Sequence, residues 1–273
     1  MEFKGAMGGL YRITEWITRI AASNLLWLLC SSPFMFFLLM RVMMALKNVN
    51  TDSSTLVGMA VLAPFTIFPA TTALFTVVRK WVMGEGDLSV PRTYFKGYKE
   101  NYKQSMIGGV FYTILFVIMA VDMRVYMGKM QNLQLVGLAM LLLLILLSVS
   151  MFNFFSMVAH YHMPTRLILK NAILLTIIRP VRILLTAIGA AMVLLLTYKF
   201  LWLIALGTAS IIAWIAFANF YAAFNKMQAQ IAKMNGQTEA VVDGAPEMDQ
   251  EKEEQLLQPV VYGNSQTKEN NKI

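Results

Sequence analysis

Residue types that enzymes use for chemistry are few in this 273-residue chain, and they form no catalytic or metal-binding pattern. Cys30 is the only cysteine, so the chain can form neither an internal disulfide nor a site of paired thiolates. His160 and His162 stand two residues apart, which on a helix points them to different faces. GxSxG, HExxH and phosphate-binding GxxxxGK(S/T) motifs are missing. We therefore predict that the protein is not an enzyme and has no catalytic residue, cofactor or metal.

Transport of a solute across a membrane is another function to consider, and it needs polar groups inside apolar segments. Ionisable side chains at such positions are usually functional, but here the candidates are neutral. Pro64 and Pro69 would free backbone carbonyls within one apolar run, which either line a polar cavity or bend the helix around its neighbours. We favour bending. The cavity candidates are Pro64, Pro69, Thr71, Thr72 and Asn153.

The elements that would position these residues are apolar runs long enough to cross a bilayer. A hydrocarbon core of about 30 Å requires about 20 helical residues, and within it only helices or closed barrels satisfy every backbone group. No run contains Asp, Glu, Lys or Arg, and none shows the strict alternation of a barrel strand. We predict an all-α membrane protein with six transmembrane helices at about 20–40, 55–78, 105–121, 133–158, 183–198 and 200–224.

The basic residues give an orientation to these predicted helices. If the N-terminus is cytoplasmic, eighteen of the 23 Lys and Arg residues face the cytoplasm and five face outside. Short cytoplasmic loops carry such an excess in membrane proteins. The sequence therefore predicts a multi-pass membrane protein with both termini in the cytoplasm. The net charge of +8 indicates anionic lipid headgroups rather than nucleic acid as the partner, because the charge lies next to the apolar runs.

Three amphipathic segments are predicted to lie at the cytoplasmic interface, one before each pair of spans: residues 1–19, 91–103 and 165–178. In the second, Arg92, Lys96, Lys99 and Lys103 recur every three or four residues and form one stripe, here named the basic stripe. The six predicted spans, within a membrane domain of residues 20–226, then form three transmembrane hairpins. Residue identity between the three hairpins is poor. The polar residues 235–273 are predicted to form a disordered, acidic tail.

One block of sequence resembles a known family. The run from Phe68 through Pro69, Thr71 and Thr72 to Arg79, Lys80 and Trp81 is similar to the most recognisable segment of the YesL-like family, uncharacterised membrane proteins of Gram-positive bacteria. Further similarity lies at Phe95 to Gln104 and at Lys170 to Pro180. The resemblance implies a location in the bacterial cytoplasmic membrane. It also implies an association with carbohydrate utilisation, of the pectin or rhamnogalacturonan type, among sugar importers and sensor kinases. It implies no catalytic residue or cofactor.

Two functions follow as hypotheses. The first is a non-enzymatic accessory or regulatory component of carbohydrate uptake or sensing, whose partner is a subunit of a sugar ABC importer or of a sensor kinase. Its contact candidates are Arg79, Lys80, Trp81, Arg92, Lys96, Lys99 and Lys103. The second is a transporter of a neutral solute along the Pro and Thr residues of the second span. No coupling sequence of an ABC permease is present, so the chain is not expected to be that permease.

Overall fold

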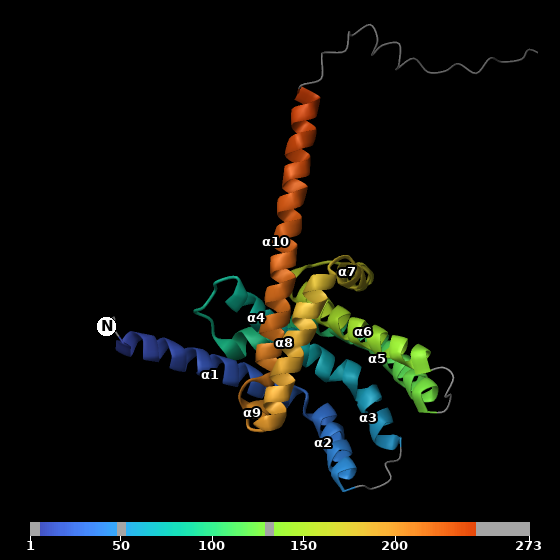
Figure 1. The fold of residues 1–273 in the computed structure, drawn as a ribbon. Coiled ribbons are helices and arrows are strands. Elements are labelled where there is room, and N and C mark those ends of the chain that lie inside the picture. Colours follow the sequence, from blue (N-terminus) through green and yellow to red (C-terminus); the bar gives the residue numbers. More distant parts are fainter. Residues whose placement is uncertain (1–5, 48–52, 129–133, 244–273) are drawn as a thin grey trace, which may run out of the picture. The chain divides into compact units, whose positions relative to one another are not determined.

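The computed structural model describes residues 6–47, 53–128 and 134–243, and within these ranges it contains helices and no strand. The all-α prediction is thus confirmed. The chain divides into two units, Met1–Phe224 and Asn225–Ile273. Figure 1 shows the helices α1 (Ala6–Cys30), α2 (Ser32–Leu46), α3 (Ser54–Leu62), the 3-10 turn η1 (Ala63–Phe65), α4 (Ile67–Val82), α5 (Val90–Gly128), α6 (Gln134–His160), α7 (Thr165–Ile178), α8 (Pro180–Lys199), α9 (Leu203–Leu206) and α10 (Thr208–Asp243).

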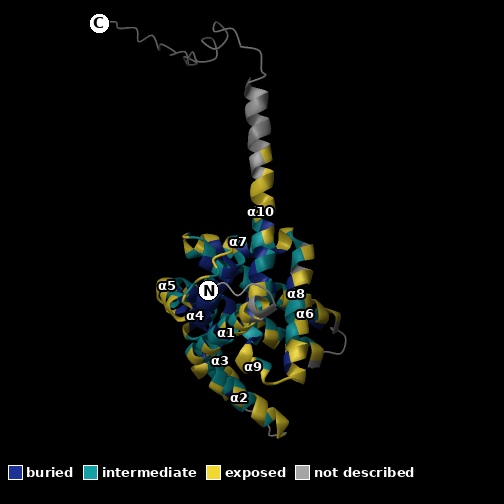
Figure 2. Ribbon diagram, turned by 90° about the vertical axis from the view of Figure 1, so that its left-hand side faces the viewer, coloured by how far each residue is buried: buried dark blue, intermediate teal, exposed yellow. Residues whose placement is uncertain are grey.

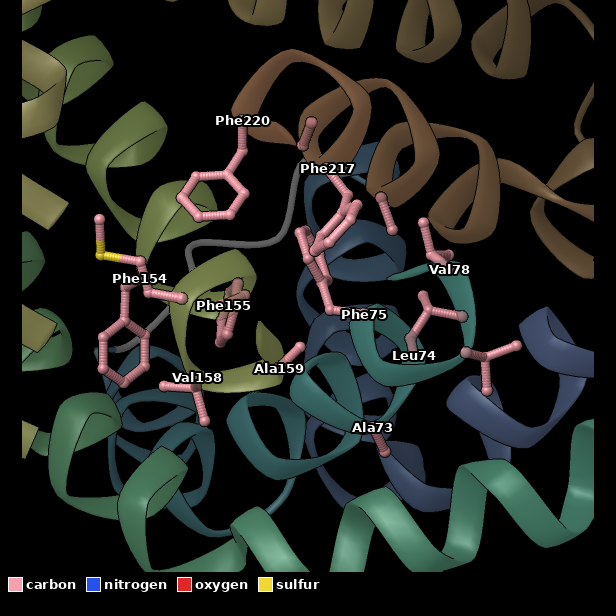
Figure 3. Close-up of a cluster of buried hydrophobic side chains, with 14 of the residues drawn as sticks. Ala73, Leu74, Phe75, Val78, Phe154, Phe155, Val158, Ala159, Phe217 and Phe220 are labelled. Carbon is pink, nitrogen blue, oxygen red and sulfur yellow. The ribbon is translucent and has the colours of Figure 1, made fainter. Parts of the chain in front are cut away.

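The centre of the first unit is α4, the helix that carries the family-like block. Ala70, Ala73 and Val77 are fully buried, and Phe75 is 1% exposed. Small residues on several sides of α4 let α1, α5 and α6 approach its backbone. Figure 3 shows Phe154 and Phe155 of α6 and Phe217 and Phe220 of α10 gathered around the α4 side chains. The helix is therefore the core against which its neighbours pack.

Close packing of α5 on this core depends on a pair of glycines. A Cβ atom on Gly109 would lie 2.9 Å from Pro64 Cα, and one on Gly108 would overlap the ring of Phe154. Both glycines are buried. Because glycine has no side chain, α5 can pack closely against η1, α4 and α6 at these two positions.

Three helices are long and apolar enough to cross a membrane, and up to five if each of two bent pairs counts as one span, among the residues that the structure describes. The three are Val90–Met127, Leu135–His160 and Thr208–Gln230, which contain most or all of the predicted third, fourth and sixth spans. A shorter apolar helix, Leu184–Lys199, coincides with the fifth. Figure 2 shows that residues on the outer surfaces of α2 and α5 are exposed, where a membrane would cover their apolar side chains.

The predicted first span, 20–40, is not one helix. The segment Tyr11–Cys30 and α2 meet at an angle of 83°. Pro33 has no backbone N–H and lies in the first turn of α2, while the Ser31 hydroxyl donates to the Trp27 carbonyl at 2.6 Å. The amphipathic N-terminal segment also continues into α1 without a break at residue 19.

The second and sixth spans are broken as well. Residues Ser54–Phe65 and Ile67–Val82 meet at 45°, with Pro64 inside η1 and Pro69 in the first turn of α4. The predicted bending by proline is therefore correct at Pro64, whereas Pro69 sits where a helix tolerates it. Residues 200–224 divide into α9 and α10 at Gly207.

Two other boundaries differ from the prediction. Segment 91–103 and the third span form a single 39-residue helix, α5, because no proline or glycine turn separates them. In the second unit, α10 continues to Asp243, so residues 235–243 of the predicted disordered tail are helical. Residues 244–273 of that tail lie outside the described residues. By contrast, α7 begins and ends at the predicted residues 165 and 178.

Candidate functional site: polar contacts around the central helix

The end of the family-like block, Arg79 to Trp81, binds mainly inside the protein. Arg79 Nη1 donates to the Ala159 carbonyl at 3.1 Å, in the last turn of α6, where a cation complements the helix dipole. Trp81 is 6% exposed, and its ring meets that of Trp16 at 5.7 Å between centroids and 70° between planes. Lys80 Nζ lies 3.0 Å from Glu85 Oε2 on the surface. Of these three contact candidates, only the Lys80 side chain has its polar end on the surface.

Beside Arg79, an aromatic cluster encloses the end of α6. The ring of His160 is within 6.2 Å of Phe217 and Phe220 and closer to Tyr161 and Phe224, measured between ring centroids. Burial raises the pKa of Tyr161, which keeps its phenol neutral. The described residues contain no group of three or more His, Cys, Asp or Glu side chains able to hold a metal. His160 is thus part of an aromatic packing cluster in this structure.

The basic stripe occupies the exposed face of the first turns of α5, and its four members are all exposed. The opposite face is fixed to the core. Tyr94 is fully buried and donates its hydroxyl proton to the Ala70 carbonyl at 3.0 Å. Gln104 Nε2 donates to the Met163 carbonyl at 2.6 Å. The stripe is therefore a cationic surface on a rigid element. Among the described residues, the carboxylate that pairs with it is that of Glu100, 3.9 Å from Lys96.

The cavity candidates of the second span contact other groups inside the protein. Thr71 Oγ1 accepts a hydrogen bond from Trp27 Nε1 at 3.0 Å and donates to the Ile67 carbonyl. Thr72 is fully buried and accepts from Ser105 Oγ at 2.8 Å. Pro64 and Pro69 are buried between helices. The hydroxyls of Thr71 and Thr72 are thus bonded to other groups inside the bundle.

Asn153, the remaining cavity candidate, lines a narrow cavity between α6, α7, α8 and α10. Its Nδ2 donates to Thr176 Oγ1 at 2.9 Å, and Asn219 Nδ2 donates to Thr186 Oγ1 at 3.2 Å. The cavity encloses about 270 Å³ including its open mouth. Its lining residues are Val149, Asn153, Leu175, Arg179, Arg182, Thr186, Asn219, Phe220 and Ala223.

Sequence reasoning did not single out two residues of this cavity, Arg179 and Arg182. It used them to orient the chain and to end the amphipathic segment 165–178. Their position on both sides of Pro180, at the corner between two apolar helices, was the available signal.

A polar contact that holds α1 to the broken sixth span centres on Asn24, which is fully buried. Asn24 Nδ2 donates to the carbonyls of Ile204 and Ala205 at 2.7 and 2.9 Å, and its Oδ1 accepts from the Ala209 amide at 3.0 Å. One side chain thus satisfies backbone groups on both sides of the break at Gly207. Broken helices often build transport sites, but these groups are already occupied.

Over the residues that the structure describes, the fold and these contacts define an all-helical protein with several helices that could span a membrane, in which Asn24, Thr71 and Thr72 are hydrogen-bonded between helices. Residues 20–123 match the family described as "Protein of unknown function, DUF624". The chain is 30% identical to the uncharacterised protein YteU of Bacillus subtilis (strain 168) over 177 residues, which is 65% of this chain and 68% of YteU. It belongs to this family, so the resemblance to the YesL-like proteins is confirmed.

Two more proteins of the same strain are similar. YesL is 29% identical over 69% of this chain and 76% of its own length, and YesV is 26% identical over 48% of this chain and 63% of its own. Both are described as uncharacterised. No solved structure matches the chain.

Proposed function

We propose that this protein is a non-enzymatic accessory or regulatory component of a carbohydrate uptake or sensing system in the bacterial cytoplasmic membrane. The observation that carries the accessory role is the contrast between hydroxyls of the second span that are bonded inside the protein and a cationic surface that is exposed. Thr71 and Thr72 are bonded to other side chains, whereas the basic stripe is exposed. The carbohydrate association rests on the resemblance to the YesL-like family.

The topology that we propose has six spans in three hairpins, with both termini in the cytoplasm. Its support is that each predicted span corresponds to a candidate span, a bent pair or the shorter apolar helix. The turn 83–89 would lie inside, and the turn 200–202 outside. The excess of Lys and Arg near the first turn follows the rule for cytoplasmic loops.

Single cysteines in a Cys30→Ser background test this topology. Glu85 and Leu201 are both exposed turn residues, so Glu85→Cys and Leu201→Cys are a matched pair. In intact cells, a membrane-impermeant maleimide should label Leu201→Cys and not Glu85→Cys, while opened cells should allow both. Labelling of Glu85→Cys in intact cells would contradict the proposed orientation.

Recovery of partners tests the accessory role. Intact protein from membranes of cells induced with pectin fragments, taken up in mild detergent, should retain an importer or sensor kinase subunit. Replacing the four residues of the basic stripe by Gln should reduce this recovery about tenfold or more, since four surface contacts of about 0.5 kcal/mol each total about 2 kcal/mol.

The control for this experiment carries Arg166→Gln and Lys170→Gln, two exposed basic residues on α7. It should retain the partner. Equal loss of the partner in both variants would show that the partner is held by general electrostatic attraction and not by the basic stripe. Recovery of the wild-type protein with neither an importer subunit nor a kinase subunit would refute the accessory role.

The alternative, a neutral-solute transporter along the second span, has less support. The hydroxyls that would line its pathway are engaged inside the bundle. Uptake into reconstituted vesicles that is lost in Thr71→Val with the protein still folded would favour it.

A further inference from the structure

We propose that a groove between α1 and the first turn of α5 binds one acyl chain of an anionic phospholipid. The groove has a volume of about 410 Å³, which lies in the range of sites for small ligands. Val90 and Pro91 form its α5 side. Its other lining residues recur every three or four positions along one face of α1: Tyr11, Thr14, Glu15, Thr18, Arg19 and Ala22.

The shape of the groove selects its occupant. Tyr11 and Ala22 are eleven residues apart, which is about 16 Å along a helix. Over that length the volume corresponds to a mean cross-section of about 25 Å². An extended peptide needs about 48 Å², because neighbouring strands lie about 4.8 Å apart and stacked sheets about 10 Å apart. A helix is at least about 10 Å wide. A single hydrocarbon chain is thinner than both, so it fits where a peptide would not.

The charged side chains of the groove are already paired. Arg19 donates to Glu15 Oε1 and to the Gly86 carbonyl. Thr18 donates its hydroxyl proton to the Thr14 carbonyl at 2.9 Å. The six other residues that line the groove carry no charge. An uncharged chain therefore suits the groove, because its lining leaves no charge to be balanced by a ligand.

The face of α1 that lines the groove continues into an exposed apolar surface. Leu25 and Leu29 follow Ala22 at intervals of three and four residues, so they lie on the same face of the helix. They are 52% and 66% exposed. In the proposed membrane location, on which this step rests, that surface would contact lipid. An acyl chain that lies along α1 would then extend from the bilayer into the groove.

The basic stripe adds a preference for the headgroup. It begins at Arg92, which directly follows Pro91 and is exposed. Basic residues at a membrane surface attract anionic headgroups. The chain in the groove and the headgroup near the stripe would thus belong to the same lipid.

Native mass spectrometry of the purified full-length protein in detergent tests the proposal. The probes are phosphatidylglycerol and phosphatidylcholine with the same acyl chains. The wild type should retain phosphatidylglycerol in a saturable manner. Thr18→Trp puts a large ring in the middle of the groove at an exposed position, so it should weaken retention at least tenfold. Ile17→Trp adds a ring outside the groove lining, at a position that is 56% exposed, and should change retention less than twofold.

A second measurement locates the acyl chain. Phosphatidylglycerol with a photoreactive group in this chain should crosslink to residues 11–22 or to Val90 and Pro91 in the wild type. Thr18→Trp should remove this crosslink, with thermal unfolding as the check that the variant is folded. Arg92→Gln should reduce the preference for phosphatidylglycerol over phosphatidylcholine and preserve the crosslink.

Each outcome decides the proposal. No retention of either lipid, equal retention by the wild type and Thr18→Trp, or crosslinks only outside these segments would overturn it. Equal retention of the two lipids by the wild type would overturn the assignment of an anionic headgroup. If Thr18→Trp does not fold, the crosslink in the wild type still decides. No measurement involves a carbohydrate-system partner, so a failure here is distinct from a failure of the accessory role.

Discussion

Gly108→Ala is expected to lower the free energy of unfolding by about 3 kcal/mol, at the upper end of what overpacking a core usually costs. The added Cβ would lie 2.6 and 2.7 Å from two ring carbons of Phe154, in addition to a closer overlap with Cζ. Phe154 is fully buried and packs against the rings of Tyr112 and Phe155. The ring cannot move aside, so α5 would have to separate from α6.

Thermal or denaturant unfolding in detergent measures this effect, and Gly9→Ala is the matched control. A Cβ on Gly9 meets nothing within 4 Å. Because alanine favours a helix by about 1 kcal/mol over glycine, this control should be neutral or slightly stabilising. Adding Phe154→Leu to Gly108→Ala should restore part of the loss. Equal stability of Gly108→Ala and wild type would show that α5 does not pack as closely as described.

Asn24→Leu is the second large effect, an expected loss of about 4 kcal/mol. The substitution keeps the branching at Cγ and the number of side-chain heavy atoms but removes all three hydrogen bonds to Ile204, Ala205 and Ala209. Each buried backbone group left without a partner costs about 1–3 kcal/mol, and a surrounding bilayer offers no water as a substitute. The contact between α1 and the break in the sixth span should then open.

Asn171→Leu makes the same chemical change at a half-buried position of α7 for which no side-chain hydrogen bond is found among the described residues. It should alter stability by less than about 1 kcal/mol. Limited proteolysis within 200–207 provides a local readout, because cleavage there should increase only in Asn24→Leu. Equal stability of the two variants would mean that Asn24 does not hold the broken helix.

The sequence predicted the properties that depend on local composition. Apolar runs without charge, spaced along the chain, were sufficient to predict an all-helical protein with membrane-spanning segments, and the block from Phe68 to Trp81 was sufficient for the family. Pro164 and the Arg179–Pro180 pair bounded α7 at the residues where it begins and ends. Hydrophobicity and proline act on their own segment, so a single sequence reveals them.

The candidate site was predicted less well. The exposure of the basic stripe followed from helical periodicity. The inward contacts of Arg79 and Trp81 did not, because their partners, Ala159 and Trp16, lie far away in sequence. The same holds for Thr71 and Thr72, whose hydroxyls bond to residues of α1 and α5. A threonine in an apolar run is equally compatible with lining a solute pathway and with forming a hydrogen bond between two packed helices.

What the sequence alone determined is thus the kind of protein: helical, membrane-spanning in composition, basic next to its apolar runs and a member of a recognisable family. Only the tertiary structure decided that α4 is the central helix and that Asn24 bonds to the backbone on both sides of the break at Gly207. It also decided that Arg179 and Arg182 line the same cavity as Asn153. The physical reason is the range of the forces. Helix formation and the hydrophobicity of a segment depend on a few turns of that segment, whereas these hydrogen bonds and close contacts join residues between 33 and 185 positions apart in the chain.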